Sequence, residues 1–125
     1  MATLTPRLIL ESEYDSVGTT TGTTLISVDD TLSVTSPATN LASKLVATGS
    51  ASELIASNSA HSYIYIKAVS GENATDFLQV KIGSHAVIRL DIGQFMFTPI
   101  YNGYAINTES YGGAITVEFG SWTKG

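Results

Sequence analysis

The strongest constraint on the fold is an alternation of apolar and polar residues in the second half of the chain. Segments 62–67, 76–82, 85–92 and 114–119 all show it. Successive side chains of a strand point to opposite faces, so a period of two predicts strands with one buried face. A slip of one residue would turn each apolar set to solvent, which specifies the register. The residues expected to face inward are Ile64, Ile66, Leu78, Val80, Ile82, Ala86, Ile88, Leu90, Ile92, Ile115, Val117 and Phe119.

Turn-forming residues separate these segments. Gly83-Ser84 is short enough for a tight hairpin between Ile82 and Ala86. Asn102-Gly103 predicts a second hairpin, between segments 99–101 and 104–106. Further breaks fall at 70–73, 91–94 and 112–113. Short strands at this spacing predict an all-β fold, either a small antiparallel β-sandwich or a jelly-roll-like barrel.

The first half is less regular and predicts an irregular N-terminal arm. Segment 7–10 reads as a strand, and segments 24–28 and 31–35 as a hairpin across Asp29-Asp30. After Val17, segment 17–24 contains only Gly and Thr, which predicts a flexible loop or arm. We therefore expect an N-terminal strand and flexible arm over residues 1–24 and a β-sandwich over 25–125, in a single domain overall.

Two stretches between these regions allow less definite interpretations. Segment 37–47 fits a short helix with Leu41, Leu45 and Val46 on one side, or a strand that includes Leu45 and Ala47. Segment 54–56 reads as a further strand.

Composition excludes several kinds of partner. The chain has 125 residues, of which 43% are apolar and only 14% charged, with a net charge of −5. Its six Lys and Arg residues are scattered, whereas binding to nucleic acid or to an anionic membrane surface needs a basic cluster. Ser and Thr fill the gap left by charged residues. A hydroxyl-rich surface suits a protein that packs against neighbours, although Thr also simply favours strands.

Catalytic and metal-binding patterns are not found in the sequence. It has no Cys, which excludes disulfides, thiolate catalysis and Cys-ligated zinc. His61 and His85 each begin an expected strand and have no ligand partners at metal-site spacing. The sequence contains no G-x-S-x-G nucleophile motif, and Asp29-Asp30 fits a turn better than a carboxylate pair. We expect a protein that is not an enzyme, with no cofactor and no metal.

The sequence also predicts where the protein is made. The N-terminal residues lack the basic and apolar regions of a secretory signal. No segment approaches the roughly 20 apolar residues of a membrane-spanning helix. We expect synthesis in a cytoplasm and no membrane partner.

Exposed aromatic residues are the candidate binding residues. Tyr63 and Tyr65 share an outward face of their strand with Lys67, and other aromatic residues lie in or near turns or close to the C-terminus. Exposed Tyr and Trp anchor protein interfaces or stack on sugars, and the two strand residues could instead fill a second layer at a sandwich edge. The candidates for a protein interface are Tyr63, Tyr65, Tyr101, Tyr104 and Trp122.

Segment 53–67 contains a strand, a short Asn-containing turn and a second strand with alternating Ile residues. In this pattern residues 53–120 resemble small virion proteins of tailed bacteriophages, whose second strand reads x-Ile-x-Ile-x-Asn, although Ala68 lies near the position of the final Asn. Segment 90–95 keeps the Leu and Gly of their Leu-x-Pro-Gly-Glu turn but replaces its Pro and Glu. Segment 114–120 resembles their closing strand.

This resemblance implies a capsid decoration or cement protein that stabilises the head by bridging capsid subunits. It implies the major capsid protein or other virion proteins as partners, a location in the virion after synthesis in the host cytoplasm, and a homo-oligomer. Two alternatives stay open at this point: a tail, baseplate or fibre module of the same fold, and a carbohydrate-binding module that uses Tyr101, Tyr104 or Trp122.

Overall fold

A computed structural model describes residues 2–5, 7–12, 23–29, 32–34, 41–57, 63–100 and 104–122. The chain divides into two compact units, Met1–Ala38 with Gly125, and Thr39–Lys124. Every regular element in the described ranges is a β-strand, which confirms the predicted fold class. The boundary expected after Thr24 falls inside a strand, Thr23–Asp29, whereas the division between the units follows Ala38.

The first unit consists of two strand pairs. Its strands are β1 (Ala2–Leu4), β2 (Arg7–Ser12), β3 (Thr23–Asp29) and β4 (Leu32–Val34). β1 pairs with β4 and β2 pairs with β3, both antiparallel. The hairpin predicted across Asp29-Asp30 is therefore wrong, because its two strands pair with β2 and β1 instead of with each other. Most of the predicted Gly/Thr loop, residues 17–22, lies outside the described residues, and its last two residues begin β3.

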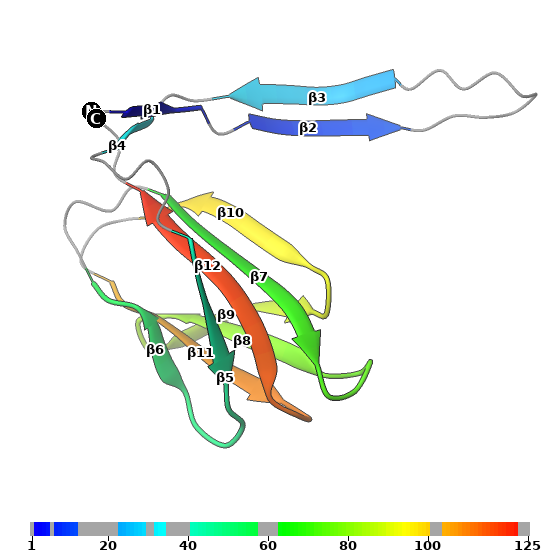
Figure 1. Ribbon diagram of the computed structural model, residues 1–125, viewed down its shortest axis with the longest axis vertical. Coiled ribbons are helices and arrows are strands. Elements are labelled where there is room, and N and C mark those ends of the chain that lie inside the picture. The colour runs from blue at the N-terminus through cyan, green and yellow to red at the C-terminus, as the bar shows by residue number, and fades with distance from the viewer. Residues whose placement is uncertain are drawn as a thin grey trace, which may run out of the picture. The chain divides into compact units, whose positions relative to one another are not determined.

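The second unit is a sandwich of two four-stranded antiparallel sheets (Figure 1). One sheet has the order β10-β7-β12-β5 and the other β6-β11-β8-β9. The strands are β5 (Ala42–Val46), β6 (Ser52–Ile55), β7 (Tyr63–Gly71), β8 (Phe77–Ile82), β9 (His85–Asp91), β10 (Phe95–Pro99), β11 (Ile106–Tyr111) and β12 (Ile115–Trp122).

The pairing of these eight strands is that of a jelly roll. The first strand pairs with the last, β5 with β12, and the next pairs lie inside it: β6 with β11, β7 with β10 and β8 with β9. Rolling this four-part hairpin adds the contacts of β7 with β12 and of β8 with β11. The sheets stay open at their edges, so of the two predicted forms the sandwich is confirmed and a closed barrel is not.

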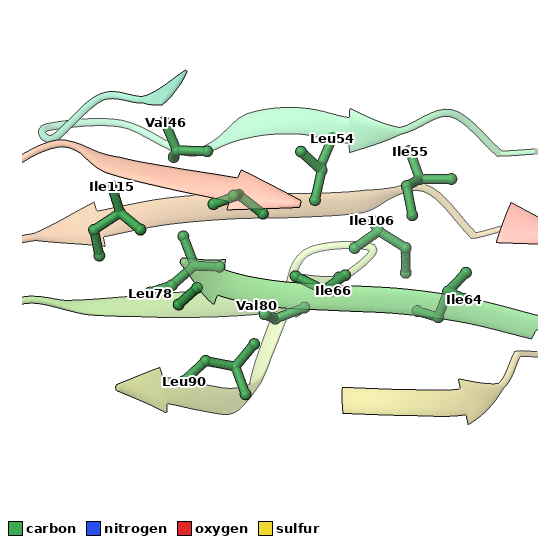
Figure 2. Packing of buried hydrophobic residues seen from close by; sticks show 12 residues of the cluster. Val46, Leu54, Ile55, Ile64, Ile66, Leu78, Val80, Leu90, Ile106 and Ile115 are labelled. Carbon is green, nitrogen blue, oxygen red and sulfur yellow. The ribbon is translucent and has the colours of Figure 1, made fainter. Parts of the chain in front are cut away.

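The predicted inward residues make the core between the two sheets. Figure 2 shows Ile64 and Ile66 of β7 with Leu78 and Val80 of β8 pointing into a common interior. Leu90, Ile106, Ile115 and Val117 are buried with them, and Ile82, Ile88, Ile92 and Phe119 pack against this cluster. The prediction is confirmed for these residues, except that Ile106 was not among the predicted inward residues. Of those predicted, only Ala86 has a side chain that lies outside the description.

Two predicted turns had different outcomes. Gly83-Ser84 joins β8 to β9, and Gly83 has a φ of 63°, which suits the first central position of a type II′ turn. Asn102-Gly103 lies outside the described residues, but the hairpin pairing predicted around it is wrong. β10 pairs with β7 in one sheet, whereas β11 pairs with β6 and β8 in the other. The turn signal predicted a chain reversal but carried no information on which sheet the next strand joins.

The ambiguous segment before the sandwich is resolved where it is described. Residues 42–46 form strand β5, which pairs with β12 along its whole length. Only Val46 of this strand is buried, because β5 is an edge strand with one neighbour.

Candidate functional site

Five aromatic residues gather on the outer face of the sheet β10-β7-β12-β5. Phe97 is the register partner of Tyr65, and Tyr63 is the register partner of Trp122 on the other side of β7. The opposite face of β7 carries the buried Ile64 and Ile66, so these aromatic residues face away from the core. We call this set the aromatic face: Tyr63, Tyr65, Phe95, Phe97 and Trp122.

The rings of the aromatic face stack across the strands. Tyr63 stacks on Phe97 with ring centroids 5.2 Å apart and an angle of 25° between the rings. Phe97 also meets Trp122 at 5.9 Å and 40°. Such pairs contribute roughly 0.5–1.5 kcal/mol beyond the area that they bury. The stack therefore holds Phe97 in place although its side chain remains accessible.

Exposure is concentrated on the edge strand β10. Phe95 is 61% exposed and Phe97 40%, whereas Trp122 is only 9% exposed. At the other edge of the same sheet, Leu45 is 65% exposed. Its register partner is Thr116, whose neighbours Ile115 and Val117 are buried, so Leu45 also lies on the outer face. Exposed apolar side chains that lie close together, as Phe95 and Phe97 do on β10, mark interaction surfaces.

One hydrogen bond fixes the polar centre of the aromatic face. The hydroxyl of Tyr65 donates to Glu118 Oε1 at 2.8 Å. Burial, together with this hydrogen bond and the negative charge of Glu118, raises the pKa of Tyr65 to about 12. Tyr65 is therefore a neutral donor throughout the physiological range, and it is held by its partner instead of being poised for proton transfer.

The outer face of the other sheet is polar. Lys81 Nζ lies 3.7 Å from Glu109 Oε1, and Arg89 Nε lies 2.9 Å from Asp91 Oδ1. This face also has two aromatic rings, Phe77 and Tyr111, but neighbouring side chains cover them more fully than they cover Phe95. We call it the charged face: Phe77, Gln79, Lys81, Arg89, Asp91, Glu109 and Tyr111.

The rings of the charged face are occupied by neighbours on the same chain. Phe77 and Tyr111 stack with centroids 4.9 Å apart and 10° between the rings. The guanidinium carbon of Arg89 lies 3.9 Å from the centre of the Phe77 ring. The Tyr111 hydroxyl donates to Gln79 Oε1 at 3.2 Å. These contacts leave less free ring surface than Phe95 presents on the aromatic face.

The structure brings together three of the five predicted interface residues. The aromatic face contains Tyr63, Tyr65 and Trp122 as neighbours. Tyr101 lies outside the described residues, and Tyr104 lies between β10 and β11. Tyr104 is 50% exposed, and its ring packs 3.4 Å from the position that a Cβ on Gly83 would take. The prediction missed Phe95 and Phe97, although their spacing around Met96 and the Pro at position 99 were signals of an edge strand with an aromatic outer face.

Asp76 is a buried acid that the sequence did not single out. It is 2% exposed and accepts hydrogen bonds from the backbone N–H groups of Glu72 at 3.0 Å and Asn73 at 2.8 Å. The side-chain amide of Asn73 donates to its other oxygen at 3.3 Å. A carboxylate held by these donors organises the turn before β8.

Other candidate features carry little chemistry. A shallow, open depression of about 480 Å³ is lined by Arg89, Leu90, Gly93, Gln94 and Phe95, and its one cation is already engaged with Phe77 and Asp91. In the described ranges, no three acidic or imidazole side chains lie close enough together to hold a metal ion. Those ranges also contain no helix that is long and apolar enough to cross a membrane.

Comparison of the chain with protein-family models, with curated proteins and with solved structures finds no match. A function for the chain therefore has to follow from its own surfaces and from the pattern in residues 53–120. Of those surfaces, the aromatic face exposes the largest apolar side chains on a strand of the sandwich.

Proposed function

We propose that this chain is a structural protein of a tailed-phage virion, a cement or decoration protein that binds the assembled capsid through its aromatic face. The observation that carries the proposal is the exposure of Phe95 at 61% and Phe97 at 40% on a sheet whose other face fills the core. Aromatic residues are enriched at the centres of protein interfaces, where they supply most of the binding energy. A rigid sheet presents them at little cost in conformational entropy.

The shape and charge of the face favour a protein partner. Phe97 is held between Tyr63 and Trp122, so this exposed ring is ordered before binding. Lys67 and Glu118 are register partners on the two central strands, and opposite charges beside exposed rings give specificity to a contact with a protein.

The fold permits a virion role, and the sequence resemblance supports it. Jelly rolls occur in viral capsid domains and in lectins, so the architecture agrees with both classes but does not decide between them. The resemblance of residues 53–120 to small virion proteins favours the first. A surface with few charges agrees with a protein that spends its working life in contact with neighbours.

The mechanism of stabilisation is mass action. A protein that binds the assembled shell, and not the separated subunits, shifts the equilibrium towards the shell. Contact with two neighbouring capsid subunits would bury the aromatic face and resist their separation. The chain performs no chemistry in this role, and its partners are the major capsid protein or other virion proteins.

The test compares phage heads with and without this protein. Heads lacking it should lose resistance to heat or osmotic shock, and adding back the purified chain should restore that resistance. Unchanged resistance, with the protein absent from the head in a virion reconstruction, would contradict the proposal. Hundreds of copies per particle are expected for cement, whereas a dozen or fewer would instead support the tail, baseplate or fibre alternative.

The carbohydrate-binding alternative has less support. Sugar stacking needs the open face of an aromatic ring. Of the three residues considered for it, Trp122 is only 9% exposed, Tyr101 lies outside the described residues, and Tyr104 stands against Gly83. A glycan array with a signal that is lost in Tyr104→Ala would revive this alternative.

A further inference from the structure

The two strand pairs of the first unit share one register. From Ala2↔Val34 to Leu10↔Ile26, the residue numbers of every cross-strand pair add to the same total. No residue is inserted on either side between the pairs, so the two sheets that they form follow one register, as two parts of one antiparallel ribbon would. Figure 1 shows β2 and β3 running side by side as its longer part. The register shifts only beyond Leu10. We call the strands β1 to β4 the N-terminal ribbon.

One face of the N-terminal ribbon has an apolar sequence. Alternate residues of a strand share a face, and in this register even-numbered residues pair with even-numbered residues. The odd-numbered positions of the same pairs carry mainly polar residues, including the register partners Arg7 and Asp29, with Ile9 as the apolar exception. The even-numbered positions are all apolar: Ala2, Leu4, Leu8, Leu10, Ile26, Val28, Leu32 and Val34.

The described strands of the ribbon form two-stranded sheets, and two of their apolar side chains are exposed. Leu8 is 53% exposed and Ile9 47%, and because they are consecutive they belong to opposite faces. Within the described ranges, each ribbon strand has a single pairing partner. A two-stranded ribbon is marginally stable in water, and a third strand or a packing partner is needed for independent stability. Strands of this kind therefore call for a packing partner on the apolar face.

We propose that the covering partner is a second copy of the chain, so that the N-terminal ribbon is a self-association element. Two ribbons that pack their even-numbered faces together form a small four-stranded sandwich with its own apolar interior. The contact is self-complementary: the even-numbered positions carry no charge that needs an opposite charge on a partner, which suits a two-fold interface.

The available area agrees with a stable dimer. Full burial of a Val, Leu or Ile side chain removes roughly 60–120 Å² from water, on the area scale of hydrophobic transfer. The seven Val, Leu and Ile positions amount to about 400–850 Å² per copy, which brackets the roughly 800 Å² per partner of a stable interface. The inference does not depend on the aromatic face. It adds to the proposed function, because two linked copies bind a lattice with higher avidity than one.

The first test measures the mass of the full chain in solution by light scattering or sedimentation, over a range of concentrations and without phage heads. The wild type should form dimers. Leu8→Lys should weaken dimerisation by at least about tenfold, because it buries an ammonium in the apolar contact. Ile9→Lys is the matched control: it makes the same change at a similar exposure on the opposite face and should leave the dimer intact.

Two outcomes overturn the proposal: a wild type that stays monomeric at roughly 100 µM, and a Leu8→Lys dimer as strong as the wild type. Trp122 fluorescence reports whether the sandwich stays folded in each variant. A monomeric wild type whose ribbon is protected only on phage heads would assign the ribbon to a capsid partner instead.

A second measurement remains informative if Leu8→Lys unfolds the ribbon. The chain has no Cys, so Leu8→Cys and Ile9→Cys each introduce a single thiol. At concentrations that favour the dimer, Leu8→Cys should be alkylated several-fold more slowly than Ile9→Cys, and dilution should remove the difference. Equal rates at all concentrations would show that neither face is covered and would contradict the proposal.

Discussion

The two outer faces of the sandwich differ in what covers their aromatic rings. On the charged face, Phe77 lies between the Tyr111 ring and the Arg89 guanidinium, so neighbours on the same chain occupy it. On the aromatic face, Phe97 is held by Tyr63 and Trp122 but remains 40% exposed, and Phe95 is 61% exposed. Both faces rest on the same core.

This difference suggests that the covered rings contribute to the stability of the chain, whereas the uncovered rings contribute to binding. An isolated chain gains little from leaving Phe95 in water, since a polar residue on an edge strand would protect the sheet edge better. The charged face shows that the chain has the means to cover a ring with its own side chains. The uncovered rings of the aromatic face agree with the proposed contact with another protein.

The largest expected effect comes from breaking the core that supports both faces. Ile66 is fully buried at the centre of β7, and Ile66→Ala should lower the free energy of unfolding by about 2–5 kcal/mol. The control Leu45→Ala removes a 65% exposed side chain from the same sheet and should cost less than about 0.5 kcal/mol. Urea unfolding followed by Trp122 fluorescence measures both. Equal losses would mean that the core assignment is wrong.

The next effect concerns the turn that joins β11 to β12. Gly112 has a φ of 94°, and a Cβ at this position would collide with Asp76 Oδ1. Gly112→Ala should destabilise the protein by about 2–4 kcal/mol, from the backbone strain and the displaced carboxylate together.

Gly49→Ala is the matched control for this change. Gly49 has a similar φ of 99° but nothing within 4 Å of the added methyl group, so only the backbone cost of about 1–2 kcal/mol remains. Thermal unfolding of the two variants measures the difference. If both variants unfold at the same temperature, the close packing of Asp76 against Gly112 contributes nothing to the cost of the substitution.

The sequence predicted the inner layer of the sandwich well because burial imposes a period of two. The inward residues of β7, β8, β9 and β12 follow from that alternation alone, and the Gly83-Ser84 turn follows from its length and its glycine. These are local patterns, and local patterns determine the faces of a strand.

Pairing between distant strands could not be predicted in the same way. β5 pairs with β12, and β7 with β10, because both sheets must cover one core. The residues in the turns do not indicate which strands will pair. The exposure of the site residues also depends on this pairing. Trp is a residue type that is common in interfaces, but Trp122 is almost completely covered. Phe95 is exposed because β10 lies at the edge of its sheet.

A smaller effect is expected from a substitution that uncovers a ring on the charged face, so that it resembles the aromatic face. Arg89→Ala uncovers the Phe77 ring and should cost about 0.5–1 kcal/mol of stability, while binding of a hydrophobic dye to the folded protein increases. Lys81→Ala removes the same charge from the same face without uncovering a ring. If the two variants bind dye equally, covering by Arg89 is not what distinguishes the faces.

The smallest effect is confined to high pH. Because the pKa of Tyr65 is raised to about 12 in the folded protein, the unfolded chain releases this proton first, near the usual value of 10. The stability associated with Tyr65 is therefore complete below pH 10 and falls as the pH rises from 10 to about 12. The difference between the tyrosinate absorbance titrations of wild type and Tyr65→Phe should have its midpoint near 12. A midpoint near 10 would mean that the contact with Glu118 does not persist in solution.

The most direct test of the aromatic face is the binding of matched aromatic variants to phage heads that lack this protein. Phe97→Ser removes a ring that is 40% exposed on the aromatic face, and Tyr111→Ser removes one that is 37% exposed on the charged face. The account predicts that Phe97→Ser, alone or with Phe95→Ser, weakens binding by at least about tenfold, as expected for the loss of an interface anchor. Tyr111→Ser should bind as the wild type does. Equal binding by both variants, or a greater loss for Tyr111→Ser, would contradict the assignment of the aromatic face as the capsid-binding surface.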